Sequence, residues 1–182
     1  MKFVLKNDNC TLLFKITVGD YWCKADIEIV QDEFYYGGLE PQPYPCKVDC
    51  HIIDDESIRT RELWELCDMM EDLYEGVYIN EEPHFVEPVF AISFINSHVQ
   101  KSIVQRPDGT SYKEYHEILP QMVFKINLAA PYGSQFDNNI CLRFDPSNTQ
   151  FFYWYILYLT GQIDSSSRKI QALIKEGIMI DE

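Results

Sequence analysis

Basic residues are scarce in this chain, which has 15 Lys and Arg against 29 Asp and Glu and a formal net charge of −14. Nucleic-acid binding needs Lys and Arg gathered against phosphates, and an anionic membrane surface attracts the same residues. Both partner classes are therefore disfavoured. A basic protein is compatible with this charge because complementary fields speed association, although acidity alone mainly confers solubility.

Long apolar runs are also missing. The most apolar stretch, FFYWYILYL at Phe151–Leu159, is half the ~18 residues that a membrane span requires. The first ten residues, MKFVLKNDNC, contain an apolar run of only three and do not resemble a signal peptide. We therefore expect a cytoplasmic protein whose six cysteines are reduced thiols. A length of 182 residues, 46% of them hydrophobic, predicts one globular domain over residues 1–182.

The familiar catalytic signatures are absent from the sequence: it has no Gly-rich dinucleotide loop, no P-loop, no HExxH helix and no nucleophile elbow. Cys46, Cys50 and His51 have a spacing unlike that of structural zinc sites, and strand alternation turns His51 away from the two thiols. Cys67 lies on the apolar side of an acidic helix, which raises a thiol pKa rather than lowering it. We therefore predict no catalytic residue, no metal and no cofactor.

Two histidines have acidic neighbours in the sequence, which is the minimum for a general acid–base pair. His116 precedes Glu117, and His84 lies near Glu82 and Glu87. Proximity in sequence alone does not bring two side chains together on a strand. We interpret both histidines as residues at strand edges.

Strands are predicted where apolar residues recur at every second position, a pattern found between Val4 and Ile53 on both sides of a loop at Gly37–Pro45 and again near Phe90. Pro107-Asp108-Gly109 predicts a hairpin turn, since proline presets φ and glycine accepts a positive φ. The residues expected on buried strand faces are Leu12, Phe14, Ile16 and Val18; Cys23, Ala25, Ile27 and Ile29; Cys46, Val48, Cys50 and Ile52; Phe90, Ile92 and Phe94; Met122, Phe124, Ile126 and Leu128; and Ile140, Leu142 and Phe144.

Three segments have a helical pattern instead. One begins at Thr60 as N-cap and ends at Gly76, with an apolar stripe made of Leu63, Leu66, Cys67, Met70, Leu73 and Tyr74. A second, DPSNTQFFYWYILYLTG, begins with capping residues and ends at Gly161. A third, SSSRKIQALIKEG, uses Ile170, Leu173 and Ile174. Together these patterns predict an α+β fold: about seven to nine mostly antiparallel strands in a meander or sandwich, one inserted amphipathic helix and two C-terminal helices.

The aromatic segment Phe151–Leu159 allows two interpretations. Tyr and Trp are enriched at interfaces, so it is a candidate binding patch. More often such a helix packs in the core with its tyrosine hydroxyls directed to water, and we favour that interpretation. The alternative predicts a small-molecule or enzymatic site between the sheet and this helix, lined by Tyr and Trp.

Acidic residues are concentrated between Asp54 and Glu87, where twelve acids and two arginines give a net charge of −10. Glu65, Asp68, Asp72 and Glu75 fall opposite the apolar stripe, where solvation of a helix explains them. The excess continues beyond Gly76, and solvation of the helix does not account for this continuation. The candidate partner-binding surface therefore comprises Glu65, Asp68, Asp72, Glu75, Glu81 and Glu82.

Four segments follow one another along the chain: GDYW at Gly19–Trp22, the helix with Leu63, Leu66 and Leu73, the strand FVEPVFAISF with Phe85, Glu87, Pro88, Phe90, Ile92 and Phe94, and the aromatic helix after RFDPSNTQ. Their order resembles that of the immunity proteins paired with wall-associated, rearrangement-hotspot-type contact-dependent toxins of bacteria (the Wap immunity family). The resemblance implies a cytosolic, non-enzymatic protein that binds and blocks a cognate toxin, often a basic nuclease. A structural homodimer is a further possibility.

Overall fold

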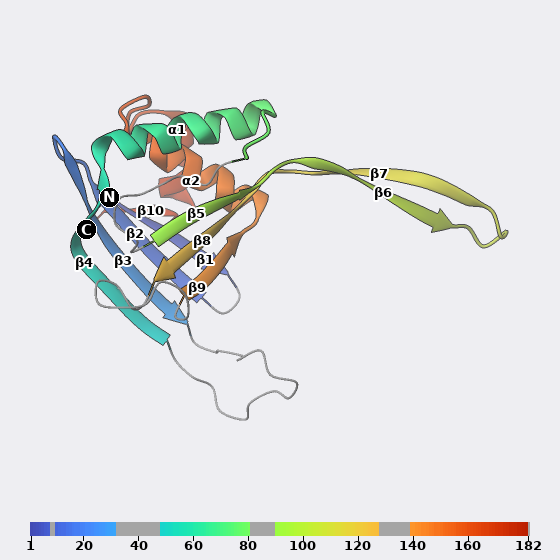
Figure 1. Cartoon of the computed structure of the whole chain (residues 1–182), viewed down its shortest axis with the longest axis horizontal. Helices are drawn as coiled ribbons and strands as arrows, with labels where there is room; N and C mark the ends of the chain where they lie inside the picture. Colours follow the sequence, from blue (N-terminus) through green and yellow to red (C-terminus); the bar gives the residue numbers. More distant parts are fainter. Residues whose placement is uncertain (8–9, 32–47, 81–89, 128–138, 182) are drawn as a thin grey trace.

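The computed structural model describes residues 1–7, 10–31, 48–80, 90–127 and 139–181. The described part is α+β, with three antiparallel sheets and three helices, which confirms the predicted fold class (Figure 1). None of the three helices combines the length and apolarity needed to cross a lipid bilayer.

The largest sheet has the strand order β10-β1-β2-β3-β4. Strands β1 to β4 form an antiparallel meander. The last strand of the chain, β10, pairs with the remaining edge of β1. The sequence pattern did not predict β10, because two residues are too few to show alternation. The bounds are β1 (Lys2–Asn7), β2 (Cys10–Thr17), β3 (Trp22–Gln31), β4 (Val48–Arg59) and β10 (Met179–Ile180).

The predicted core face of this sheet is largely confirmed. Leu12, Phe14 and Ile16 of β2 are buried, as are all four residues predicted for β3. Val18 was wrongly assigned to this face, because it lies beyond the end of β2 and is 41% exposed. The apolar face predicted for β4 falls on side chains outside the described residues.

The second sheet has the order β5-β8-β9, with β5 (Phe90–Ile95), β8 (Gln121–Asn127) and β9 (Asn139–Phe144). Between β5 and β8 the chain forms β6 (His98–Gln105) and β7 (Ser111–Ile118), a two-stranded arm that extends away from the body (Figure 1). The predicted turn is present at its tip. Gly109 has a φ of 82°, and the Asp108 carboxylate accepts hydrogen bonds from the amide and hydroxyl of Thr110 at 2.9 and 2.6 Å.

Helix α1 (Thr60–Glu75) follows β4 directly. The Glu62 carboxylate accepts a hydrogen bond from the Arg59 amide at 2.9 Å, so Arg59 is the N-cap and Thr60 is the first helical residue, contrary to the prediction. The Thr60 hydroxyl instead donates to the Gly19 carbonyl at 2.7 Å. The helix ends at Gly76 as predicted, with a φ of 82°. The buried side of α1 consists of Leu63, Leu66, Cys67, Met70 and Leu73, with Tyr74 partly exposed at its edge.

Helix α2 (Pro146–Leu159) joins the two larger sheets. The Tyr155 hydroxyl accepts a hydrogen bond from the Ile16 amide of β2 at 3.1 Å, and the Thr149 hydroxyl accepts one from the Met122 amide of β8 at 3.1 Å. The buried aromatic rings that meet around α2 are Phe3, Phe14, Phe124, Phe144, Phe152 and Tyr155. The prediction that the aromatic helix packs in the core is confirmed, but the Tyr155 hydroxyl bonds to the core strand rather than to water.

Helix α3 (Arg168–Lys175) packs against α2 and leads into β10. Its residues Ile170 and Leu173 are buried, as predicted. Ile174 was expected on the same apolar face, but it is 39% exposed because the short helix buries only one narrow side.

Candidate functional site

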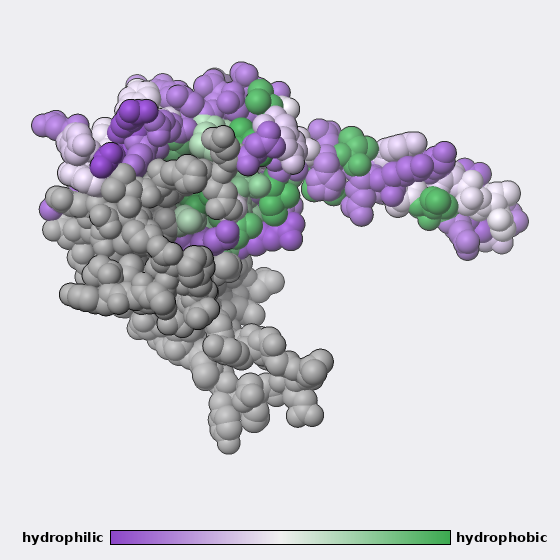
Figure 2. All heavy atoms as spheres, in the orientation of Figure 1, coloured by the Kyte–Doolittle hydropathy of each residue, from purple (hydrophilic) through white to green (hydrophobic). Residues whose placement is uncertain are grey.

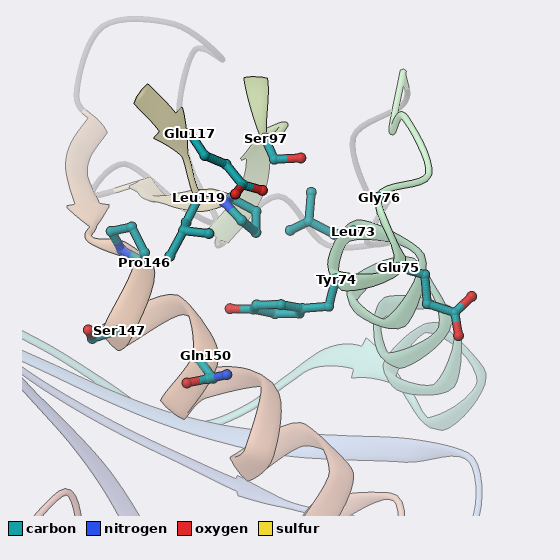
Figure 3. A pocket seen from close by; sticks show the side chains of 11 residues that line it. Leu73, Tyr74, Glu75, Gly76, Ser97, Glu117, Leu119, Pro146, Ser147 and Gln150 are labelled. Carbon is teal, nitrogen blue, oxygen red and sulfur yellow. The ribbon is translucent and has the colours of Figure 1, made fainter. Parts of the chain in front are cut away.

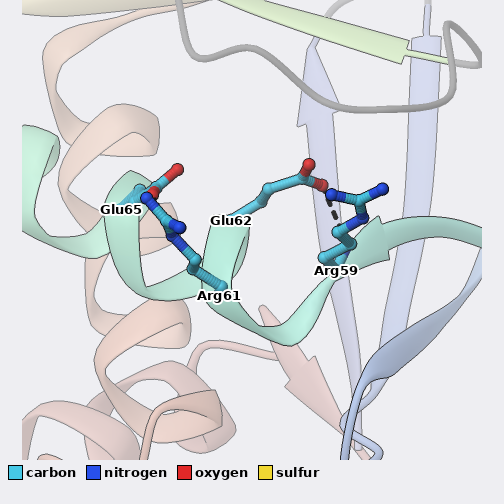
Figure 4. Close-up of polar contacts among 4 residues, drawn as sticks. All are labelled: Arg59, Arg61, Glu62 and Glu65. Carbon is cyan, nitrogen blue, oxygen red and sulfur yellow. Dashed lines mark hydrogen bonds and ion pairs between the residues drawn. The ribbon is translucent and has the colours of Figure 1, made fainter.

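Helix α1 carries six acids and a single base, and most of the acids face solvent. Glu62 caps the start of the helix, and Arg61 pairs with Glu65 through a 2.7 Å contact (Figure 4). Asp68, Glu71, Asp72 and Glu75 are exposed and form no ion pair with any described residue. The outer side of α1 is accordingly hydrophilic in Figure 2. We call the exposed residues Glu65, Asp68, Glu71, Asp72 and Glu75 the acidic face.

The acidic face is arranged against the electrostatics of its own helix. Asp72 and Glu75 lie in the last turn, where unpaired carbonyls favour cations, and this turn contains no basic residue. The spacings 68–72 and 71–75 place like charges on neighbouring turns, which costs about 0.2–0.5 kcal/mol per pair. The left-handed cap at Gly76 stabilises the end of the helix, whereas these charges destabilise it. Helix stability does not explain these acids.

A tryptophan lies within the acidic face. Trp64 is 44% exposed, and at about 100° per residue it projects beside Asp68 and Glu71. Large exposed aromatic residues are typical of the anchors of protein interfaces. Trp64 and Glu71 were not among the predicted partner-binding residues, although the helical projection that selected the other acids places both of them off the apolar stripe.

The structure brings together four of the six predicted partner-binding residues. Glu65, Asp68, Asp72 and Glu75 are all exposed on one side of α1. Glu81 and Glu82 lie outside the described residues, as does Glu87, so the predicted continuation beyond Gly76 is not part of the described surface.

A pocket of about 420 Å³ opens where the C-terminal end of α1, the base of the β6–β7 arm and the first turns of α2 meet (Figure 3). Two hydrogen bonds support one side of this junction: Asn96 accepts from the Ile79 amide at 2.8 Å and donates to the Ile79 carbonyl at 2.9 Å. The lining residues are Leu73, Tyr74, Glu75, Gly76, Ser97, Glu117, Leu119, Pro120, Pro146, Ser147 and Gln150.

The polar groups of this pocket have unused hydrogen-bonding capacity. The Tyr74 hydroxyl is buried and has no hydrogen-bond partner among the described residues. Its ring stacks on Tyr153 with centroids 5.3 Å apart, and burial together with the neighbouring phenol raises the pKa of Tyr74. Burial, followed by the charge of Glu71, raises the pKa of Tyr153 to about 12. Both phenols therefore remain neutral hydrogen-bonding groups at physiological pH.

The region between the large sheet and α2, where the alternative hypothesis expects a ligand site, is filled by aromatic rings. Phe3 stacks on Tyr155 with ring centroids 5.1 Å apart, and the ring centroids of Phe14 and Phe152 are 5.7 Å apart. A hollow at the edge of this region measures about 20 Å³. That is room for a single water molecule.

No group of three or more His, Cys, Asp or Glu side chains within the described residues could hold a metal ion. The candidate at Cys46, Cys50 and His51 lies on residues or side chains outside the described set, and so does His84. His116 contacts Glu114 at 3.3 Å, whereas Glu117 projects from the opposite side of β7.

Cys67 is buried, and loss of solvent raises its thiol pKa, as its position on the apolar stripe predicted. The Gln162 amide donates to its sulfur at 3.2 Å. The thiol is therefore a packing residue rather than a reactive one.

The comparisons with known proteins add no relative from which a function can be transferred. No family model matches this chain, and no curated protein or solved structure is significantly similar to it.

Proposed function

We propose that this chain is an immunity-type protein that binds and neutralises a basic toxin domain, with the acidic face of α1 as its principal contact surface. The observation that carries the proposal is the set of exposed, unpaired acids at Asp68, Glu71, Asp72 and Glu75, arranged against helix electrostatics. Charges that destabilise their own helix are accounted for when a partner supplies the opposite charge.

The support beneath the acidic face suits a binding surface. The opposite side of α1 is buried through Leu63, Leu66 and Met70, so the backbone that carries the acids is fixed before a partner arrives. A fixed surface loses little conformational entropy on binding. Trp64 adds an aromatic anchor within the charged surroundings.

Electrostatics determine how such a protein would act. An acidic surface steers a basic partner toward it and covers the positive cleft with which a nuclease holds its substrate. Long-range attraction between exposed charges is screened beyond ~8 Å at physiological ionic strength. Association should therefore slow as salt is added, while dissociation depends on close contacts such as that of Trp64.

The test uses the C-terminal domain of the protein encoded immediately upstream, co-expressed with this chain. Neutralisation would appear as restored growth, and binding kinetics would be measured with the purified pair. Replacing Glu65, Asp68, Asp72 and Glu75 by Ser should slow association at least ~10-fold at low salt. Trp64→Ala should weaken binding by ~10-fold or more, mainly through faster dissociation.

A matched pair of variants separates local charge from net charge. Asp68→Ser with Asp72→Ser and Glu176→Ser with Asp181→Ser each remove two exposed acids, but the second pair lies at the end of α3 and beyond β10. Only the first pair should impair neutralisation. Equal effects of the two pairs, or unchanged affinity after the fourfold replacement, would reject the acidic face as the binding surface.

A further inference from the structure

The pocket at the junction of α1, the arm and α2 borders the acidic face, because Leu73, Tyr74, Glu75 and Gly76 of the last turn of α1 form one of its walls. Its volume of about 420 Å³ falls within the range of ~300–1,000 Å³ that small-ligand sites occupy. A partner lying along α1 would therefore meet the pocket at the end of the helix.

The charge of the pocket selects a cation. Glu117 directs its carboxylate from the base of the arm toward Ser97, whereas the Glu75 carboxylate points away along the outside of α1 (Figure 3). Asp145, the N-cap of α2, directly precedes the lining residue Pro146 and adds a negative charge beside the pocket. The positive end of the α2 dipole is equivalent to about half a charge, so the carboxylates dominate the field.

The neutral groups of the pocket can all accept hydrogen bonds. Tyr74 extends from α1 toward α2, with Gln150 on the facing helix (Figure 3). The hydroxyl of Ser147 and the amide of Gln150 have no hydrogen bond to a described side chain, and the Glu117 carboxylate has no ion pair there. The Tyr74 hydroxyl is buried without a hydrogen-bond partner among the described residues, which is unfavourable until something bonds to it.

We propose that this pocket binds an arginine side chain presented by the basic partner, an inference that rests on the proposed function and names the chemistry of one contact. A guanidinium has five donors and no acceptor, arranged in a fixed plane. A guanidinium can therefore donate hydrogen bonds to the Glu117 carboxylate and, at the same time, to acceptors on Gln150, Ser147 or Tyr74. A lysine ammonium offers three donors from one point and matches acceptors on separate elements less well.

The test needs no partner protein. N-acetyl-arginine N-methylamide is titrated into the ¹⁵N-labelled full chain, with the citrulline analogue as an uncharged control of nearly the same shape. The arginine compound should shift the amides of Tyr74, Gly76 and Gln150 in a saturable way with a Kd on the order of 1 mM, as expected for a ligand of this size. The citrulline compound should bind at least ~10-fold more weakly, because it lacks the charge.

Two variants of β7 provide the matched control. Glu117→Gln removes the pocket carboxylate and should weaken the arginine compound about 10-fold. Glu114→Gln makes the same change on the opposite side of the same strand and should leave affinity unchanged. The assignment would be overturned if the citrulline compound bound as tightly as the arginine compound. It would also be overturned if the amide shifts were confined to Asp68 and Asp72 and did not change in Glu117→Gln.

The two proposals fail in different ways. If the arginine compound binds in the pocket but the chain does not neutralise the upstream domain, the proposed function is wrong and the pocket remains a guanidinium site. If neutralisation depends on the acidic face but the arginine compound does not bind, the pocket assignment alone is wrong.

Discussion

Helix α1 and the β6–β7 arm both present exposed side chains, but they differ in charge and in support. The outer side of α1 is strongly acidic, while its inner side is buried through residues such as Leu66 and Met70. Between His98 and Ile118 the arm has three bases and three acids and therefore no net charge. It exposes Val99, Ile103 and Tyr115 on one face, at 65, 68 and 62%.

The difference in support matters more than the difference in charge. The arm's pairing partners among the described residues are its own two strands, and an isolated two-stranded hairpin is marginally stable in water. Helix α1 instead shares the core with α2 and β4. A change on α1 should therefore be felt by the whole protein, whereas a change on the arm should stay within the arm.

The largest contrast is expected from truncating one apolar side chain in each region. Met70 is fully buried, so Met70→Ala should lower the free energy of unfolding by about 2–5 kcal/mol through lost burial and a residual cavity. Ile103→Ala on the exposed arm should change it by less than ~0.5 kcal/mol. Urea unfolding followed by far-UV circular dichroism measures both. Similar losses would show that the arm folds as part of the core.

A smaller and better-matched contrast comes from two glycines. Gly76 and Gly109 both have a φ of 82°, and an added Cβ would meet no atom within 4 Å at either position. Alanine at a left-handed position costs about 1–2 kcal/mol, so the local penalty should be the same at both sites. The two substitutions should differ in whether this penalty lowers the stability of the whole protein or only that of the arm.

Gly76→Ala should lower the global free energy of unfolding by that amount, since α1 unfolds with the core. Gly109→Ala should leave global stability unchanged and speed amide hydrogen exchange in β6 and β7 by about 5–30-fold, with α1 unaffected. Faster exchange in α1 after Gly109→Ala would contradict the independence of the arm.

The fold was largely predictable because its elements have strong local patterns. Alternation at Cys23, Ala25, Ile27 and Ile29 identified β3, and Pro107-Asp108-Gly109 identified the arm's turn. The pairing of β10 with β1 was not predictable, because it joins the two ends of the chain through a two-residue strand. Nor did alternation reveal that the arm is detached, since exposed and half-buried strands share the same period.

The candidate site was predictable only in part. Helical spacing places the acids of α1 on one face, and the same geometry would have added Trp64 and Glu71. The pocket was beyond sequence reasoning, because Tyr74, Glu117 and Gln150 come from three segments that tertiary packing alone brings together. Likewise, the long-range hydrogen bond between Ile16 and Tyr155 leaves no pattern along the chain.

A third pair of substitutions should stabilise the protein rather than destabilise it, because it reverses the sign of two charges at the end of α1. Asp72→Lys with Glu75→Lys places two cations at the helix C-terminus and removes like-charge neighbours, which should raise the free energy of unfolding by about 0.5–1 kcal/mol. The gain should shrink in 1 M NaCl, and neutralisation of the partner should be lost. A variant that is both more stable and fully neutralising would contradict the binding role of these acids.

The smallest effect concerns acid, and it again separates the arm from the body. Asp108 in the arm and Asp164 after α2 accept equivalent hydrogen bonds, from Thr110 and Ser166, and these bonds lower the pKa of each carboxyl. A lowered pKa in the folded state means that the stabilisation is present above the unfolded pKa of ~3.9 and is lost as pH falls through the folded value. The Asp164 turn is held between α2 and α3, whereas the Asp108 turn closes a two-stranded ladder that has no other support among the described residues.

Below about pH 4, NMR Cα shifts should therefore show the strands of the arm loosening before α3 changes. Asp108→Ala should remove this pH dependence, whereas Asp164→Ala should not. Simultaneous loss of shifts in the arm and in α3 would show that the two regions unfold as one unit.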